Sequence, residues 1–256
     1  MRRLDLNCDL GESFGAYTIG ADAEMMATIT SANVACGFHA GDPGVMRRTV
    51  RLAAAAGVAV GAHPGLPDLV GFGRRDMRVT PQEVEDMVLY QVGAFAAIAS
   101  AEGVRLQHVK PHGALYTMAS RDRALAEAIA RAIRAVDSSL ILFGPAGSEL
   151  LRAASAAGLA TAAEGFADRT YEPDGSLTPR AHAHALLQDA ASVVRRAVRM
   201  ATEDRVVTTD GSEIPLRMDT ICVHGDTPGA LELARAVRSA LERAGVTFAS
   251  FAGPTP

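Results

Sequence analysis

The chain has 256 residues, 48% of them hydrophobic and 21% charged, which predicts one large α/β domain over residues 1–256. Its formal net charge of −4 disfavours nucleic acids and anionic membranes as partners. Any positively charged site must therefore be local.

Short runs rich in valine, isoleucine and leucine alternate with longer helical patterns, and no linker or low-complexity segment divides the chain. This alternation is typical of a parallel sheet built from repeated βα units. The predicted strands are residues 4–8, 32–36, 58–62, 106–110, 139–143, 159–164 and 219–223, with 246–251 as an eighth candidate.

Helix caps mark the segments between these strands. Asp42-Pro43 and Thr227-Pro228 each place a capping side chain before a proline at the first helical position. Thr80-Pro81 does the same, and Glu83 completes a capping box there. Glycines suited to the left-handed conformation end helices at Gly57, Gly103, Gly158 and Gly245.

Chemically active side chains follow the predicted strand ends, one strand after another. An open sheet would gather such residues only near its switch point, whereas a closed barrel brings every strand end to one mouth. The sequence therefore predicts a (β/α) barrel. The residues concerned are Asp9, Glu12, His39, Asp42, His63, Lys110, His112, Glu164, Asp168, Arg169, His224 and Asp226.

Lys110 is the only lysine in the chain, and the other side chains with a permanent positive charge are all arginines. A compact, rotatable ammonium suits a phosphate or a developing oxyanion better than a planar guanidinium does. His112 follows two residues later, at a Pro-Gly turn. We therefore predict that Lys110 acts on a phosphoryl or oxyanion group, the alternative being a lysine that only snorkels from a strand end.

Asn7, Asp9 and Glu12 lie at the end of the first predicted strand and in the glycine-flanked loop after it. A carboxylate in such a loop suits a general base or a metal anchor. An Asx-turn is the alternative interpretation.

Three histidines follow successive strands, namely His39, His63 and His112. The first two lie beside glycines, which let the backbone approach a ligand closely. One histidine beside a turn is weak evidence for a site, but three in successive positions predict a shared cavity.

If a metal is bound, the predicted ligand set is Asp9, His39 and His63. His108 and His112 would stand about 13 Å apart on an extended strand, so they cannot share one metal unless the chain bends. His182 and His184 are two residues apart at a predicted helix start, where their side chains diverge. We predict that both lie on the surface.

Arginines occur in two long loops that follow predicted strands. Arg74 and Arg75 lie in the first loop and Arg169 in the second. A guanidinium binds a carboxylate or a phosphate in a bidentate way. The alternative for Arg169 is a contact with Asp168 that fastens its own loop.

Features outside the predicted site indicate the cytoplasm. Cys8, Cys36 and Cys222 are far apart and form no C-x-x-C motif, which predicts free, packed thiols in a reducing compartment. The charged N-terminal residues leave no apolar region for a signal peptide. The longest uncharged run, residues 52–67, is broken by glycine, histidine and proline, so no transmembrane helix is predicted.

The chain resembles one known family, that of the A subunit of ATP-dependent 5-oxoprolinase, also called the LamB/YcsF family. The resemblance covers nearly the whole chain, and its motifs together are highly specific. They are DLNCDLGESFG (5–15), SANVACGFHAGDP (31–43), GAHPGLPDLVGFGRR (61–75), YQVGA (90–94), HVKPHGALY (108–116), EGFADRTY (164–171), DGSLTPR (174–180) and CVHGD (222–226).

This resemblance implies a single-domain, seven-stranded TIM-like barrel of the glycoside hydrolase and polysaccharide deacetylase type. It also implies a cytosolic protein that works with two partners, subunits B and C. Together they would open 5-oxo-L-proline to L-glutamate with hydrolysis of ATP. Mg²⁺ is expected with the ATP.

The chemistry of that reaction gives provisional roles to the candidates. A five-membered lactam is a stable amide, so ATP would phosphorylate its carbonyl oxygen before water attacks. Asp9 or His39 is the candidate base for the water, and Lys110 with His112 would bind the phosphoryl group. His63 completes the catalytic candidates. Predicted substrate-binding residues are Asn7, Glu12, Arg74, Arg75, Glu164, Arg169 and His224, with the arginines assigned to the substrate carboxylate.

Two alternatives stay open at this point. A metal-dependent amide or ester hydrolase would use Asp9, His39 and His63 without ATP. A noncatalytic subunit would capture the lactam and pass it to partners. The sequence has no G-x-x-x-x-G-K-[S/T] motif and no G-x-G-x-x-G motif after a strand, so a self-contained nucleotide site is not predicted.

Overall fold

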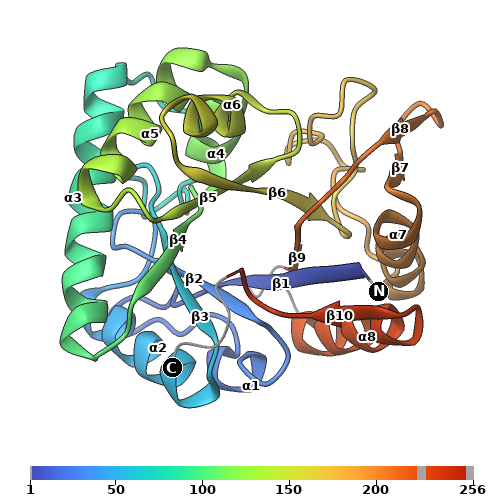
Figure 1. The fold of residues 1–256 in the computed structure, drawn as a ribbon, viewed down its shortest axis with the longest axis horizontal. Helices are drawn as coiled ribbons and strands as arrows, with labels where there is room; N and C mark the ends of the chain where they lie inside the picture. The colour runs from blue at the N-terminus through green and yellow to red at the C-terminus, as the bar shows by residue number, and fades with distance from the viewer. Residues whose placement is uncertain (1, 224–228, 252–256) are drawn as a thin grey trace.

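A computed structural model describes residues 2–223 and 229–251, and parallel strands form its centre (Figure 1). The barrel strands are β1 (Arg2–Leu10), β2 (Ser31–Ala35), β3 (Ala59–His63), β4 (Leu106–Val109), β5 (Ile141–Pro145), β6 (Ala160–Phe166) and β9 (Thr220–Val223). Each strand pairs in parallel with the next, and β1 also pairs with β9. The order β1-β2-β3-β4-β5-β6-β9 therefore closes on itself, which confirms the predicted seven-stranded (β/α) barrel.

Helices surround this barrel, as Figure 1 shows. They are α1 (Asp22–Met25), α2 (Pro43–Ala56), α3 (Pro81–Ala101), α4 (Gly113–Arg121), α5 (Arg123–Val136), α6 (Glu149–Ala156), α7 (Ala190–Glu203) and α8 (Ala230–Arg243). By length and composition alone, α3 would qualify as a membrane span. Its residues Val84, Val88, Val92 and Phe95 are fully buried at helical spacing, however, so α3 is a packed helix of the barrel's outer layer.

Strand β1 separates polar from apolar residues by simple alternation. Leu4, Leu6, Cys8 and Leu10 belong to the hydrophobic core. Asp5, Asn7 and Asp9 alternate with them and point into the barrel, where Asn7 hydrogen-bonds to Glu164 on β6. Because side chains alternate along a strand, the sequence LDLNCDL builds an apolar outer face and a polar interior at once.

The predicted caps are present wherever the described residues include them. Asp42 accepts hydrogen bonds from the backbone N–H groups of Gly44 and Val45 at the start of α2. Thr80 and Glu83 form the predicted capping box of α3. The four glycines predicted to end helices all have positive φ, at Gly57, Gly103, Gly158 and Gly245. Thr227-Pro228 lies outside the described residues.

Three features differ from the predictions. Strand β5 starts two residues later than predicted, because Asp137 accepts a hydrogen bond from the backbone N–H of Ser139 and turns the chain there. The eighth candidate strand, β10 (Val246–Phe248), pairs with the start of β1 and takes no part in closure. Two short antiparallel strands, β7 (Arg205–Val207) and β8 (Glu213–Pro215), form a separate hairpin that the sequence analysis missed.

Candidate functional site

A cavity of about 520 Å³ opens at the C-terminal ends of the barrel strands. Asp9 at the end of β1, His63 at the end of β3 and Phe166 at the end of β6 line it, together with Lys110 and His112 after β4. These strand ends meet because the barrel is closed, as the sequence analysis expected. Most of the predicted catalytic residues therefore border one cavity.

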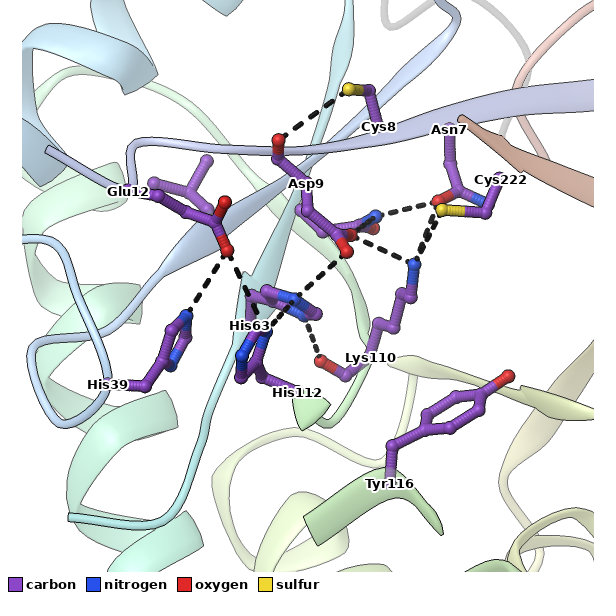
Figure 2. A network of polar contacts seen from close by, with 12 residues as sticks. Asn7, Cys8, Asp9, Glu12, His39, His63, Lys110, His112, Tyr116 and Cys222 are labelled. Atoms are coloured by element: carbon purple, nitrogen blue, oxygen red, sulfur yellow. Dashed lines mark hydrogen bonds and ion pairs between the residues drawn. The ribbon is translucent and has the colours of Figure 1, made fainter. Parts of the chain in front are cut away.

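Two groups of buried side chains meet at this end of the barrel (Figure 2). We call the first the lysine cluster, which comprises Asn7, Asp9, Lys110, Glu164 and Cys222. We call the second the histidine cluster, which comprises Glu12, His39, His63 and His112. Asp9 joins them, because its Oδ2 lies 3.4 Å from His63 Nε2.

The Lys110 ammonium is surrounded by acceptors in the lysine cluster. Its Nζ lies 2.9 Å from Asp9 Oδ1 and 2.9 Å from Glu164 Oε1. It also lies 3.3 Å from Asn7 Oδ1 and 3.1 Å from Cys222 Sγ. With 2% exposure, Lys110 does not snorkel into solvent, so the alternative interpretation of this residue is wrong.

Charge balance keeps this buried lysine protonated. Burial works to lower the pKa of Lys110, but its proximity to the carboxylates of Asp9 and Glu164 outweighs burial and raises the pKa well above its usual value. Burial also raises the pKa of the Cys222 thiol, which therefore stays neutral beside the ammonium. The cluster thus presents a fixed positive charge held between two carboxylates.

Asn7 and Glu164 lie behind the cavity rather than on its wall. Asn7 Nδ2 donates to Glu164 Oε1 at 2.9 Å and to Thr220 Oγ1 at 2.7 Å, and both residues have at most 1% exposure. The Tyr116 hydroxyl donates to Glu164 Oε2 at 2.7 Å. Asn7 and Glu164 therefore contact Lys110 from behind the cavity wall, and their substrate-binding role stays a prediction.

Deeper in the barrel, Asn33 connects strands β1 and β4. Its Nδ2 donates to Asn7 Oδ1 at 2.7 Å and to Asp9 Oδ1 at 2.8 Å. His108 Nε2 donates to Asn33 Oδ1 at 2.8 Å, and the His108 ring stacks on Phe143 with centroids 4.2 Å apart. Burial lowers the pKa of His108 to about 3, so this ring is neutral.

The three histidine rings of the histidine cluster contact one another. The rings of His39 and His112 stack in parallel with centroids 3.7 Å apart, and His63 is perpendicular to both. His112 Nδ1 lies 3.0 Å from His63 Nε2. Glu12 Oε1 lies 3.5 Å from His39 Nε2 and 3.7 Å from His112 Nδ1.

Two glycines leave the room that this close packing of rings requires. A Cβ at Gly65 would lie 2.5 Å from His39 Nδ1, and a Cβ at Gly73 would lie 2.8 Å from His112 Cδ2. Burial lowers the pKa of both His39 and His112 well below the usual value, so both rings are neutral. The cluster is therefore an enclosed group of imidazoles next to the carboxylate of Glu12.

The candidate metal ligands that lie together in the structure differ from the predicted set. Donor atoms of Glu12, His39, His63 and His112 lie within 4.8 Å of one another. Asp9, which the predicted set included, turns its Oδ1 to Lys110 and Asn33. The predicted ligand set left out Glu12 and His112, because spacing along the chain does not reveal which loop atoms converge.

Arginines line the outer part of the cavity, and they are Arg74, Arg75, Arg121, Arg169 and Arg180. Arg75 forms an ion pair with Asp68, and Arg74 lies over the Phe72 ring. Arg169 is buried and donates to the backbone carbonyls of Thr178 and Ala185, so it fastens the loop that covers the cavity. Burial lowers the pKa of Arg169 to about 10, and the side chain keeps its charge at neutral pH.

The remaining sequence predictions have mixed outcomes. Cys8, Cys36 and Cys222 are free and buried, as predicted. His182 and His184 are exposed, as predicted, although they lie in a turn before α7 and not at a helix start. His224 lies outside the described residues.

Comparison with known proteins identifies the family of this chain. The model of the LamB/YcsF family matches residues 4–255. The chain belongs to the LamB/YcsF family. It is 59% identical over 246 residues to a Tolumonas auensis protein named as the A subunit of 5-oxoprolinase, covering 96% of this chain and 98% of that protein. A Bacillus subtilis protein of the same name is 54% identical, with 96% of each chain covered.

Solved structures of LamB/YcsF type and of more distant proteins share the fold. The crystal structure of a lactam utilization protein from Thermus thermophilus has a TM-score of 0.92 and 51% identity, covering 98% of this chain and 100% of that one. The catalytic domain of a peptidoglycan N-acetylglucosamine deacetylase from Eubacterium rectale has a TM-score of 0.53 at 11% identity, covering 100% of this chain and 90% of that one. The second likeness concerns the fold alone.

Tyr116 and Asn33 are two of the polar residues of this LamB/YcsF site that the sequence analysis missed, and Arg121 and Arg180 on the cavity wall are others. Both lie inside quoted motifs, Tyr116 at the end of HVKPHGALY and Asn33 in SANVACGFHAGDP. Neither follows a strand end, since Asn33 lies within β2 and Tyr116 in the first turns of α4. A rule based on strand ends therefore passes over them.

Proposed function

We propose that the chain is the A subunit of an ATP-dependent 5-oxoprolinase, which opens 5-oxo-L-proline to L-glutamate with hydrolysis of ATP. The observation that carries this proposal is the near full-length match to relatives named as the A subunit of 5-oxoprolinase, at 54% to 59% identity. The name of the Thermus structure, a lactam utilization protein, is consistent with a cyclic amide as substrate.

The charge of the cavity suits the proposed substrate. Five arginines and Lys110 line it, against the carboxylates Asp9 and Asp76. 5-Oxoproline carries one carboxylate, and a phosphorylated lactam oxygen would add further negative charge. Arginine binds both groups through paired N–H donors. All three predicted clamps, Arg74, Arg75 and Arg169, line the cavity.

Asp9 is the residue best placed to act as base toward the attacking water. Its carboxylate borders the cavity, and its Oδ1 is held by Lys110 and Asn33 while its Oδ2 lies toward His63. Such fixed hydrogen bonds orient a base before the reaction begins. The Lys110 ammonium, 2.9 Å from the same carboxylate, would stabilise negative charge that develops at the lactam oxygen.

ATP, Mg²⁺ and two partner subunits complete the proposed activity. The sequence carries neither of the two common nucleotide-binding glycine motifs, so we assign a share of ATP handling to the partner subunits B and C. Mg²⁺ would accompany the ATP phosphates. We place the assembly in the cytoplasm, in line with the three free cysteines.

Steady-state formation of glutamate from 5-oxoproline tests the proposal. Turnover is measured for the chain alone, for the partners alone and for the full assembly, each with and without ATP. We expect turnover only in the full assembly with ATP. In that assembly Asp9→Asn should lose at least about a hundredfold in rate, whereas Asp86→Asn, on the exposed side of α3, should not change it.

Two outcomes would overturn the proposal. ATP-independent turnover by the chain alone would indicate a metal-dependent amide hydrolase. Binding of 5-oxoproline with a normal rate for Asp9→Asn in the assembly would indicate a subunit that captures substrate without taking part in the chemistry.

A further inference from the structure

We infer that the histidine cluster is a binding site for a divalent transition metal ion of the Zn²⁺ type, with His63 Nε2, His112 Nδ1 and the Glu12 carboxylate as its core ligands. The inference goes beyond the proposed function, because it concerns a metal that is distinct from the Mg²⁺ of ATP. Imidazole nitrogens favour Zn²⁺ and related ions, whereas Mg²⁺ favours oxygen ligands.

Backbone carbonyl groups fix the tautomers of two histidines. His63 Nδ1 lies 2.6 Å from the carbonyl oxygen of Lys110, and His112 Nε2 lies 2.7 Å from the carbonyl oxygen of Phe72. A carbonyl oxygen only accepts hydrogen bonds, so each of these nitrogens must carry the proton. Whenever both rings are neutral, the opposite nitrogens, His63 Nε2 and His112 Nδ1, carry the lone pairs.

Those two nitrogens lie 3.0 Å apart. No hydrogen lies between two neutral rings in these tautomers, so the contact is repulsive until a proton or a cation enters it. A metal ion beside the pair, about 2 Å from each nitrogen, would turn the repulsion into two coordinate bonds. Donation of the far N–H to a backbone carbonyl is also the usual arrangement of a metal-bound histidine.

Distances between the donor atoms agree with metal coordination. Bonds of about 2.0–2.1 Å from one ion place neighbouring ligand atoms roughly 2.9–3.4 Å apart in octahedral or tetrahedral geometry. The His63–His112 separation is 3.0 Å and the Glu12–His112 separation is 3.7 Å. All donor atoms of the cluster lie within 4.8 Å of one another, so side-chain adjustments would bring the three core ligands to one ion.

His39 is the candidate fourth ligand. It has 1% exposure, and neither of its ring nitrogens makes a hydrogen bond within the described residues. Its ring is parallel to that of His112, so their lone pairs do not converge in the present arrangement. Rotation of the His39 ring out of the stack would aim Nε2, already 3.5 Å from Glu12 Oε1, at the ion.

The proposed ion would border the cavity, because His63, His112 and Asp9 line its wall. While His39 stays stacked on His112, the three core ligands leave one position open, as is typical of zinc sites that bind water or substrate. Asp9 Oδ2, 3.4 Å from His63 Nε2, is placed to accept a hydrogen bond from a group in that position. The ligand expected at this open coordination position is an oxygen donor, such as water or an amide carbonyl.

Metal binding by the full-length chain alone tests the inference, without ATP, substrate or partners. Chelator-treated protein is titrated with Zn²⁺ by calorimetry and with Co²⁺ by visible absorption. We expect one ion per chain and Co²⁺ bands of a nitrogen–oxygen site. His63→Asn and His112→Asn should weaken Zn²⁺ binding by at least about tenfold each, and Glu12→Gln should weaken it as well.

A double variant, His182→Asn with His184→Asn, serves as the matched control, because these exposed rings lie 5.6 Å apart and could hold an adventitious ion. The control should bind Zn²⁺ like the wild type. Loss of binding in this control, unchanged binding in a folded Glu12→Gln variant, or no Co²⁺ spectrum in the wild type would each overturn the inference. The last two outcomes are decisive even if the histidine variants do not fold. Because no turnover is measured, failure here leaves the proposed function untouched.

Discussion

The lysine cluster and the histidine cluster lie side by side at the barrel mouth and are equally buried, but their polar atoms are used differently. In the lysine cluster, Lys110 has four acceptors within 3.3 Å, and two of them are carboxylates. In the histidine cluster, His63 Nε2 and His112 Nδ1 lie 3.0 Å apart, and neither ring nitrogen of His39 has a hydrogen-bond partner in the described part of the chain. The protein thus completes one group internally and leaves the other to be completed by a ligand.

This difference separates stability from function at one site. A buried polar group that lacks a partner costs about 1–3 kcal/mol, so a cluster kept in that state is retained for another reason. A buried charge with full partners rigidifies its surroundings and holds Asp9 in place. The predictions below test whether the two clusters divide these tasks.

Replacing Lys110 with methionine should cause the largest loss of stability. Methionine fills a similar volume but leaves Asp9 and Glu164 as buried carboxylates without their cation. Removal of one partner of such a group typically costs about 3–5 kcal/mol. Urea unfolding at neutral pH measures the loss, with Arg123→Met, which breaks an exposed ion pair with Glu127, as a control that should change little. Similar midpoints for both variants would refute the central role of the Lys110 charge.

Replacing Lys110 with arginine should reduce turnover of the full assembly by on the order of a hundredfold, or about 3 kcal/mol of transition-state stabilisation. The charge stays, but a planar guanidinium cannot reproduce four contacts made by one ammonium nitrogen. The thermal midpoint of the isolated chain serves as the folding control. A normal rate in a normally folded variant would show that the ammonium geometry is irrelevant to the chemistry.

The lowered pKa of His108, which contacts the lysine cluster through Asn33, predicts that the stability of the protein depends on pH. Its pKa is about 3 in the folded state and 6.5 in the unfolded chain, so only the unfolded chain takes up a proton between these values. The stability that neutral His108 contributes is therefore complete above pH 6.5 and is lost as the pH falls toward 3, by about 1.4 kcal/mol per pH unit. Urea unfolding of wild type and His108→Gln from pH 7 to pH 4 should show a shallower slope for the variant. Equal slopes would contradict the lowered pKa of His108 in the folded state.

Replacing His39 with leucine should have the smallest effect on stability, within about 1 kcal/mol in chelator-treated protein. The leucine side chain fills a similar volume, and the substitution removes two buried nitrogens that make no hydrogen bonds in the described structure. Thermal unfolding measures the change. A small gain in stability would agree best with the view that the histidine cluster, unlike the lysine cluster, does not serve stability. A loss as large as that of Lys110→Met would mean that both clusters serve stability alike.

Local signals in the sequence predicted much of the fold. Caps such as Asp42 and Thr80 act within one turn, and strand alternation in residues 4–10 needs no distant contact. The partners of Lys110 could not be predicted in this way, because barrel closure and register bring Asp9 and Cys222 to it from 101 and 112 residues away. The stack of His39 on His112 depends on loop packing around Gly65 and Gly73, which strand patterns do not describe.

Because β1 pairs with β9, the barrel cannot close until β9 has been synthesised. The Asp5 carboxylate on β1 accepts a hydrogen bond from Thr220, 215 residues later. At typical translation rates, roughly 10–40 s pass between the emergence of these two residues from the ribosome. Through that interval the polar side of β1 can contact Thr30, Ser31 and Asn33 but not its partners on β9, so the nascent chain cannot complete the site. We expect the lysine cluster to form only after release of the last barrel strand, late and in one step with closure.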